Sequence, residues 1–363
     1  MRIKFIFFLH LLLLCTICQS QKSNVTVLAY YTGGDDVDSF AIEKLSHIIF
    51  SFCHLKGNEL HVNNARDSAM IKKLVTLKKR SPQLKIMLAL GGWGGCATCS
   101  EVFSTKMGRR AFAKSVKEIN NYFGTDGLDL DWEYPAINGY PNHPFNLNDK
   151  YNFTALVKKI RQKIGTRNEL SFAAGGFKNF IETSIEWKKV MKNVNRVNLM
   201  TYDLVSGYST ITGHHTPLYS TFQNPESVDY AVSLLQEQGV ANNKIVIGAA
   251  FYGRMWEGVE DSSAGLYRNG KFKATIASKN FESFFAPDNG FRSYWDSTAQ
   301  AAYSYNPEKK LFVSYDDKKS VGLKTKYVID KGLGGIMFWQ LVDDAYDTGL
   351  LKAIDTVKEG YKK

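Results

Sequence analysis

Eight short apolar runs, rich in β-branched and aromatic residues, alternate with longer charged segments along this chain of 363 residues. Such alternation is typical of parallel strands joined by crossover helices. Eight is the strand number of the closed (β/α)8 TIM barrel, so we expect an α/β fold of that class. The predicted strands begin at Val25, His47, Lys85, Gly127, Leu170, Val197, Lys244 and Gly334.

Two kinds of segment join these strands. Residues 68–80, 111–124 and 320–332 carry apolar side chains at helical spacing opposite charged ones, which predicts crossover helices. The seventh and eighth strands are separated by roughly eighty residues, far more than one crossover needs. Because residues from about 257 to 311 are rich in aromatics, Gly and Ser, we expect a small α+β insertion there. A doubly wound two-domain fold is the alternative, but no glycine-rich phosphate loop follows its first strand.

Residues 1–20 have the composition of a secretory signal peptide. Arg2 and Lys4 precede an apolar stretch that runs from Phe5 to Ile17, and Cys18 and Ser20 suit a cleavage site for small residues. A lipid-anchored form is less favoured, because bulky residues stand before both cysteines of this segment. The stretch is too short to span a bilayer comfortably. We therefore expect a mature chain of 21–363, no membrane span, and a secreted or periplasmic location.

The net charge of +11 falls to +9 without the signal segment, and we expect the Lys and Arg to be spread along the chain and not clustered. Solubility or loose attraction to acidic surfaces explains this charge better than nucleic-acid binding does. Outside the signal, Cys53, Cys96 and Cys99 allow one disulfide and one free thiol, with the pairing open. The close pair of cysteines lacks the further ligands that zinc needs. We expect no metal, no cofactor and a monomer.

The stretch from Asp126 to Pro135, DGLDLDWEYP, carries four acids. Alternate residues of a strand face the same way, so Asp129, Asp131 and Glu133 share one face, and parity excludes Asp126 from that row. Every strand of a closed barrel is central, so the apolar face packs under the helices and the acids point inward. A solvent-facing edge strand is the alternative, and it fits a closed barrel poorly.

Crowded carboxylates in a shielded place cannot all ionise comfortably, so at least one pKa should rise. A raised pKa prepares a carboxyl group to act as a general acid. Glu133 comes last in the row, at the carboxyl end of its strand, where catalytic groups of such barrels lie. We therefore expect Glu133 to be the acid, with Asp131 and Asp129 behind it.

This stretch resembles the D-x-x-D-x-D-x-E motif of glycoside hydrolase family 18, the chitinases and their relatives. The resemblance covers nearly the whole mature chain and adds further matches at strand ends: Tyr30, Phe52, ALGGW at 89–93, MTYD at 200–203, FYGR at 251–254 and GGIMFW at 334–339. Family members often carry an α+β insertion between strands seven and eight. One departure is Ala89, where the family usually has a serine whose hydroxyl would steady the inner aspartates.

The resemblance implies a retaining glycosidase that acts by substrate assistance on N-acetylated sugars. Glu133 would protonate the leaving oxygen, Asp131 would orient the substrate's acetamido nitrogen, and Asp129 would hold the proton when Asp131 turns. Tyr202 would hydrogen-bond the acetamido oxygen, and Asp126 would give structural support. The implied sugar-binding residues are Tyr30, Phe52, Gly92, Trp93, Tyr134, Met200, Asp203, Tyr252, Arg254 and Trp339. For Arg254, tying loops together is an equally good hypothesis.

Three functions compete on this basis. Hydrolysis of β-1,4-linked N-acetylglucosamine in chitin or its oligosaccharides is favoured, because the insertion suits a deep cleft for a linear chain. An endo-β-N-acetylglucosaminidase acting on N-glycans keeps the mechanism with another substrate, but those relatives generally lack the insertion. A catalytically inactive chitin-binding lectin is disfavoured, because Glu133 is present. Cleavage within chains and cleavage from an end are both compatible with the sequence.

Overall fold

The computed structural model describes residues 25–34 and 36–361, so the predicted signal peptide lies outside the described residues. Its centre is a closed barrel of eight parallel strands, with hydrogen-bonded order β1-β14-β8-β7-β6-β5-β4-β2 and a β1–β2 pairing that closes the ring. The predicted TIM barrel is confirmed. The barrel strands are β1 Thr26–Tyr31, β2 His47–Lys56, β4 Lys85–Gly91, β5 Gly127–Asp131, β6 Glu169–Gly175, β7 Arg196–Met200, β8 Ile245–Ala250 and β14 Gly335–Trp339. A short strand, β3 (Glu59–His61), extends β2 as a hairpin.

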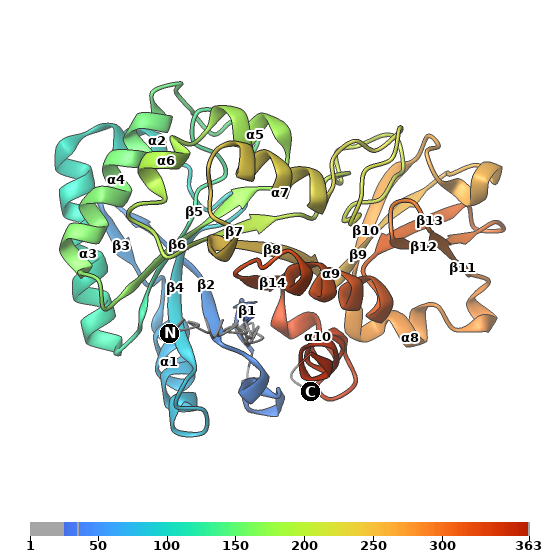
Figure 1. Ribbon diagram of the computed structural model, residues 1–363, viewed down its shortest axis with the longest axis horizontal. Helices are drawn as coiled ribbons and strands as arrows, with labels where there is room; N and C mark the ends of the chain where they lie inside the picture. The colour runs from blue at the N-terminus through green and yellow to red at the C-terminus, as the bar shows by residue number, and fades with distance from the viewer. Residues whose placement is uncertain (1–24, 35, 362–363) are drawn as a thin grey trace, which may run out of the picture.

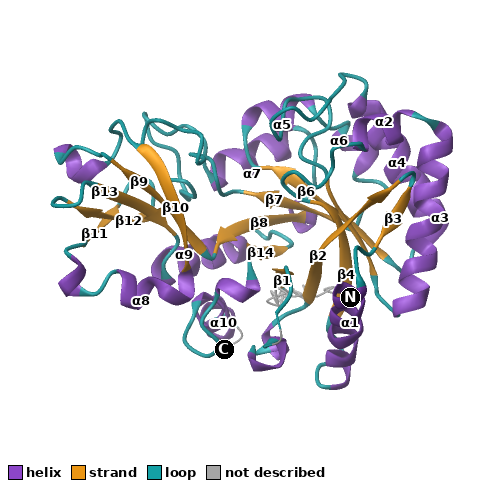
Figure 2. Cartoon of the chain, turned by 180° about the vertical axis from the view of Figure 1, so that it is seen from behind, coloured by secondary structure: helices purple, strands orange, loops and turns teal. Residues whose placement is uncertain are grey.

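Helices surround the barrel (Figures 1 and 2). The crossovers predicted at 68–80, 111–124 and 320–332 coincide with α1, α3 and α9, which are α1 Ala65–Thr76, α3 Lys106–Phe123 and α9 Lys318–Asp330. The other helices are α2 Cys99–Ser104, α4 Asp149–Ile164, α5 Lys178–Thr183, α6 Trp187–Val190, α7 Val228–Glu237, α8 Phe281–Phe284 and α10 Leu350–Gly360. Within the described ranges, no helix combines the length and apolar character needed to cross a bilayer.

The two faces of each barrel strand belong to two different cores. Outward-facing residues such as Leu128 and Leu130 pack against the helices in one large apolar cluster. Inward-facing residues such as Leu28, Met87 and Met337 fill the barrel interior. This is the alternation that the pleat of a strand dictates.

The predicted insertion is present as a five-stranded antiparallel sheet of order β10-β9-β13-β12-β11, seen on the right of Figure 1. Its strands are β9 Tyr252–Glu257, β10 Lys271–Ala277, β11 Arg292–Asp296, β12 Ala301–Asn306 and β13 Leu311–Tyr315. The insertion covers more residues than the predicted 257–311, since β9 begins at Tyr252 and β13 ends at Tyr315. The run from Lys244, predicted as one strand, divides at Phe251 into β8 and β9. Residues before Phe251 pair with β7 and β14, whereas those after it pair with β10 and β13.

A fully buried ion pair fastens the end of the insertion to the barrel. Asp316 directly follows β13, and its carboxylate lies 2.7 Å from the Nζ atom of Lys324 on α9. Lys324 also donates to Thr216 Oγ1 at 2.6 Å, and Asp316 Oδ2 accepts from the Ala250 backbone N–H at 3.0 Å. Each charge is thus neutralised and hydrogen-bonded, as burial requires.

Candidate active site

The acids of β5 lie as strand parity predicts. Asp129 and Asp131 are buried inside the barrel, with relative exposures of 0% and 4%. Trp132, like the leucines before it, packs into the outer core. Glu133 follows the strand end and is half-buried at the barrel mouth. The row therefore runs from the barrel interior to the mouth.

Asp129, the deepest acid of the row, is held by three donors. Tyr30 donates to its Oδ2 atom at 2.8 Å, and its Oδ1 atom accepts from Ser171 Oγ at 2.5 Å and from Asn198 Nδ2 at 3.0 Å. The pKa of Asp129 is nevertheless raised, because burial outweighs these hydrogen bonds. Ser171 on β6 thus supplies a hydroxyl to an inner aspartate, whereas Ala89 on β4 supplies none.

Sequence reasoning missed Ser171 and Asn198. Both are polar residues within otherwise apolar strands, and Ser171 pairs in register with Asp129. A polar residue at an inward position next to an acid is the signal that could have identified them.

Asp131 differs from Asp129 in that one of its carboxyl oxygens, Oδ1, is buried and has no hydrogen-bond partner among the described residues. Burial, and then the negative charges of Glu133 and Asp129, raise its pKa well above the usual value. A buried carboxyl oxygen without a donor is costly, so this atom is suited to a ligand that brings an N–H group.

The surroundings of Glu133 favour its protonated form. Burial raises its pKa to about 7; a hydrogen bond with Tyr134 opposes this rise, and the charge of Asp203 adds a smaller contribution to it. Asp203 itself stays ionised, because its pKa is lowered by hydrogen bonds and by the positive charge of Arg254. The fixed negative charge beside the mouth therefore helps to keep a proton on Glu133.

Arg254 clamps Asp203 from the insertion. Its Nε atom donates to Asp203 Oδ1 at 2.7 Å and its Nη2 atom to Oδ2 at 2.5 Å, a bidentate pair. Its third nitrogen bonds Thr275 on β10 at 2.9 Å. These contacts place Arg254 as a link between the β7 loop and the insertion. His215, which sequence reasoning missed, is fully buried with Nδ1 at 3.5 Å from Asp203 Oδ1.

Aromatic side chains line the mouth around these acids. Trp339 at the end of β14 stacks on Phe52, with ring centroids 5.6 Å apart and planes at 17°, and lies 5.9 Å from Tyr30. Tyr202 meets Tyr252 edge to face at 6.1 Å. Together these rings form an apolar floor and wall next to the carboxylates.

A second aromatic group stands at the exposed rim. Trp93 is 47% exposed and lies 5.5 Å from Tyr140, 6.2 Å from Tyr208 and 6.4 Å from Tyr134, between ring centroids. Tyr140 and Tyr208 come from the loops after β5 and β7, and the sequence prediction did not include them. Exposed aromatic faces beside buried acids are typical of sites that bind sugar rings.

The family sequence model of glycosyl hydrolases family 18 matches residues 26–344. The chain belongs to this family. The match confirms the resemblance drawn from the strand-end motifs and places the chain among the glycosyl hydrolases.

Individual relatives within family 18 agree with this assignment. Chitinase A1 of Niallia circulans is 34% identical over 302 residues, which cover 77% of this chain and 43% of that protein. Chitotriosidase-1 of Mus musculus is 29% identical, covering 82% of this chain and 67% of that protein. A solved family 18 N-acetylglucosaminidase from Paenibacillus barengoltzii is 34% identical with a TM-score of 0.84, covering 92% of this chain and all of that one. This chain therefore matches less than half the length of the Niallia chitinase.

Removing the charge of Asp203 should shift the pH dependence of this family 18 site. In Asp203→Asn, Glu133 loses a neighbouring negative charge and keeps Arg254 nearby, so its pKa should fall. Because a general acid works in its protonated form, we expect the alkaline limb of kcat/KM to move to lower pH, by up to about one unit. Asp126→Asn is the matched control, at the other end of the same strand. An alkaline limb that stays in place, or moves up, would contradict the role given to Asp203.

Other predicted site residues act by shaping the mouth. Gly92 has a φ of +79°, and a Cβ atom there would collide with the Phe52 ring. Its N–H donates to the Asp131 backbone oxygen at 2.9 Å, so the close approach needs glycine. Met200 belongs to the interior core, and Tyr134 contacts both that core and the outer one.

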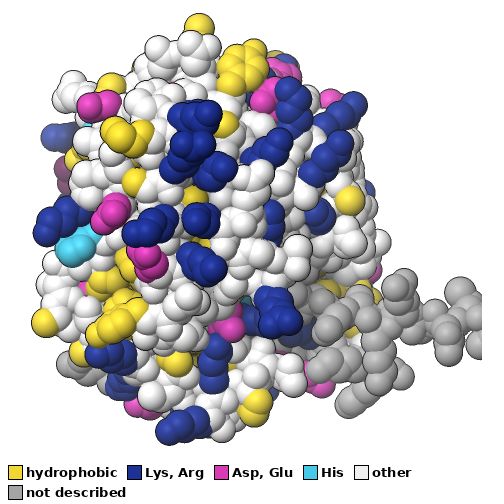
Figure 3. All heavy atoms as spheres, turned by 90° about the vertical axis from the view of Figure 1, so that its left-hand side faces the viewer, with side chains coloured by type: hydrophobic (Ala, Val, Ile, Leu, Met, Phe, Trp, Pro, Cys, Tyr) yellow, Lys and Arg dark blue, Asp and Glu magenta, His cyan; other side chains and the backbone are white. Residues whose placement is uncertain are grey.

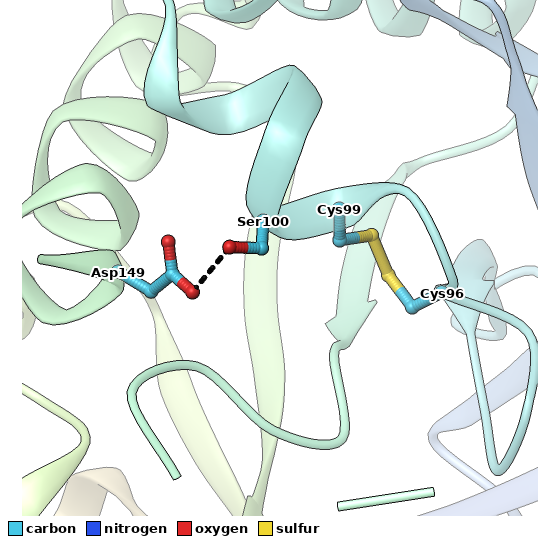
Figure 4. Close-up of a disulfide and its surroundings, with 4 residues drawn as sticks. All are labelled: Cys96, Cys99, Ser100 and Asp149. Carbon is cyan, nitrogen blue, oxygen red and sulfur yellow. Dashed lines mark hydrogen bonds between the residues drawn. A yellow bond between two sulfur atoms is a disulfide. The ribbon is translucent and has the colours of Figure 1, made fainter. Parts of the chain in front are cut away.

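A disulfide anchors the loop that carries Trp93. Cys96 pairs with Cys99 at the start of α2, and Cys53 is a buried free thiol, which settles the open pairing. One residue further, Ser100 Oγ donates to the buried carboxylate of Asp149 at 2.7 Å and ties α2 to α4 (Figure 4). The disulfide and this hydrogen bond therefore fix the loop that follows Trp93.

Asp126 lies away from the mouth, at the opposite end of β5. Its Oδ2 atom accepts from the Ile86 backbone N–H at 2.7 Å and lies 2.6 Å from Lys78 Nζ. These contacts connect β5 to the neighbouring β4 and to the segment after α1, which is a supporting position. Within residues 25–34 and 36–361, no group of three or more His, Cys, Asp or Glu side chains is arranged to hold a metal ion.

Proposed function

We propose that this protein is a retaining glycosidase that hydrolyses β-1,4-linked N-acetylglucosamine in chitin or chito-oligosaccharides with the help of the substrate's own acetamido group. The observation that carries the proposal is the buried, unpartnered Oδ1 atom of Asp131 beside a glutamic acid with a raised pKa. The substrate's acetamido N–H is a donor of the kind that this oxygen lacks. The names of the chitinase relatives support the choice of substrate.

The chemistry proceeds in two steps. Glu133 first donates its proton to the glycosidic oxygen as the bond from that oxygen to the anomeric carbon breaks. The acetamido carbonyl oxygen attacks the same carbon and forms an oxazolinium ion, while Asp131 holds the acetamido N–H. The Glu133 carboxylate then takes a proton from water, whose oxygen attacks the anomeric carbon. The bond from that carbon to the acetamido oxygen breaks, which opens the oxazolinium ring and restores the acetamido group. Two displacements at one carbon leave its configuration retained.

The remaining site residues position the sugar. Asp129, fixed by Tyr30, Ser171 and Asn198, can share a proton with Asp131 when the latter turns toward the substrate. Tyr202 is half-buried near the acids and is placed to donate to the acetamido oxygen. Trp339 forms the platform under the reacting sugar, since an aromatic face packs well against the C–H face of a sugar ring. The exposed Trp93 offers a second platform beyond the scissile bond.

Product analysis tests the choice of substrate. The protein is incubated separately with chito-oligosaccharides of defined length and with a high-mannose glycoprotein, and the products are identified by mass spectrometry. We expect cleavage of the oligosaccharides. Cleavage of the glycoprotein alone would instead support an endo-β-N-acetylglucosaminidase, and binding without turnover of either would support a lectin.

A second candidate has specific support. The solved N-acetylglucosaminidase is matched over its whole length at 34% identity. An enzyme that releases single N-acetylglucosamine units differs from a chitinase in its first product, so a time course with chito-oligosaccharides separates the candidates. Disaccharides or longer fragments support a chitinase, and a monosaccharide supports an N-acetylglucosaminidase.

We also propose that the protein acts outside the cytoplasm, on the basis of residues 1–20. Sequencing the amino terminus of the protein recovered from the natural source tests this. A start near Gln21 is expected, and an intact Met1 would contradict it.

A further inference from the structure

The expectation that Lys and Arg are spread along the chain is wrong, because the positive charge is concentrated in one part of it. Residues 65–192 contain 22 of the 46 Lys and Arg and 11 of the 35 Asp and Glu. The other residues carry 24 of each sign, so the segment accounts for the whole net charge of +11. Several of its acids lie inside the barrel or are buried, among them Asp129, Asp131 and Asp149. The exposed surface of the segment is therefore more basic than its composition.

The fold gathers these cations on neighbouring helices. α1, α3, α4 and α6 pack beside one another along one flank of the barrel. α3 carries five Lys and Arg and one acid, and α4 carries five Lys and Arg and one acid, Asp149, which is buried. Exposed cations of these helices and of the turns that follow them make up the surface here called the basic face, namely Lys72, Lys79, Arg80, Lys106, Arg110, Lys114, Lys117, Lys158, Lys163, Arg167, Lys188, Lys189 and Lys192. Figure 3 looks onto this side of the molecule and shows many dark-blue side chains with few magenta ones.

Most of these charges are not neutralised within the protein. Lys114 pairs with Glu118 at 3.1 Å and Lys189 with Glu186 at 2.7 Å. In contrast, no carboxylate of the described residues lies within 4.0 Å of Arg110, Lys117 or Lys158. Like charges held close together on rigid helices repel one another and produce a positive potential that attracts anions.

We propose that the basic face binds a linear anionic polysaccharide, carboxylated or sulfated, while the barrel mouth cleaves the neutral polymer. On α3 the cations at 106, 110, 114 and 117 follow helical spacing, which sets them about 6 Å apart along one line. Such a line suits a polymer with evenly repeated charges. The face lies on a helical flank and not at the carboxyl ends of the barrel strands, so a bound polyanion leaves the mouth open.

The side chains between the cations favour a glycan over other polyanions. The large exposed apolar residues of α3 and α4 are Met107, Tyr122 and Tyr151, spread along the helices. The Tyr122 ring is covered by the Lys72 ammonium group, 5.5 Å from its centroid. Single-stranded nucleic acid needs a row of stacking platforms and a bilayer needs a contiguous apolar wedge, whereas Met107, Tyr122 and Tyr151 are separated from one another along these two helices. The choice of a glycan partner rests also on the proposed function, because acidic glycans can occur beside the neutral polymer.

Salt-gradient elution from immobilised heparin, a sulfated polysaccharide, tests the proposal with the full chain. The purified protein should be retained at low salt, and the triple variant Arg110→Glu, Lys117→Glu, Lys158→Glu should bind about tenfold more weakly or worse at 0.1 M salt. The matched control Lys271→Glu, Lys309→Glu, Lys318→Glu makes the same change in charge elsewhere and should lose less than about twofold. Both variants should hydrolyse a small soluble glycoside like the wild type, which also shows that they fold.

Two results would overturn the proposal. Equal loss of heparin binding in both triple variants would mean that net charge, and not this face, is responsible. Retention on duplex DNA or on anionic phospholipid vesicles at least as tight as on heparin would assign the face to another class of partner. A wild-type protein that binds heparin but hydrolyses no glycoside would contradict the proposed function without contradicting the binding of a polyanion to the basic face.

Discussion

Glu133→Gln is expected to lower kcat on a chromogenic chitobioside by about 100- to 10,000-fold, the range that a positioned general acid provides. Glutamine has almost the same shape as glutamic acid, so the floor of Trp339 and Phe52 and the row of aspartates should keep their geometry. The amide cannot donate a proton to the leaving oxygen or accept one from water. Binding of an uncleaved oligosaccharide, measured by calorimetry, should therefore change only a few-fold.

The control for this variant is Glu118→Gln, the same chemical change on the exposed surface of α3. It should leave both kcat and binding unaltered. If wild type and Glu133→Gln gave the same turnover, catalysis by this residue would be excluded. A loss of binding as large as the loss of kcat would instead show that Glu133 holds the sugar without acting as an acid.

Lys324→Met is expected to lower the free energy of unfolding strongly, because it breaks the buried ion pair between α9 and the end of the insertion. The substitution leaves the Asp316 carboxylate buried and without its cation, and removing one partner of a buried pair costs about 3 to 5 kcal/mol. Urea unfolding followed by circular dichroism measures the free energy of unfolding. Lys326→Met, on the same helix, removes an exposed pair with Asp330 and should change stability little.

A double variant keeps this prediction testable if Lys324→Met fails to fold. Replacing Asp316 with Leu as well removes the stranded charge, so the double variant should recover much of the lost stability. An equally small effect of the Lys324 and Lys326 substitutions would contradict the view that the buried pair fastens the insertion to the barrel.

The eight strands of the barrel were predictable because the position of each strand follows from local pattern. Alternating apolar runs placed all eight strands, and the period of two in DGLDLDW placed Asp129 and Asp131 inside the barrel and Leu128 and Leu130 outside. The end of the seventh strand was misjudged, because the apolar run continues through Phe251 into the first strand of the insertion. Only the partner strands show where β8 ends and β9 begins. Pattern along one strand does not reveal which sheet that strand joins.

Contacts between distant segments were the part that sequence did not reveal. Ser171, Asn198 and His215 are ordinary polar residues until the closed barrel brings them beside Asp129 and Asp203. The basic residues of α1, α3, α4 and α6 are separated in the sequence, yet the fold sets these helices side by side on one flank. These features depend on which helices and strands become neighbours, so they follow from the closed fold.

If the substrate's acetamido group is the nucleophile, as we propose, then weakening that group should slow the reaction. In a series of chromogenic chitobiosides, the N-acetyl group next to the scissile bond carries zero, one, two or three fluorine atoms, and kcat/KM is measured for each. Fluorine withdraws electrons from the carbonyl oxygen, so kcat/KM should fall steeply with each added atom. A kcat/KM that stays constant across the series would exclude the acetamido group as nucleophile, because the attacking group would then belong to the protein or to water.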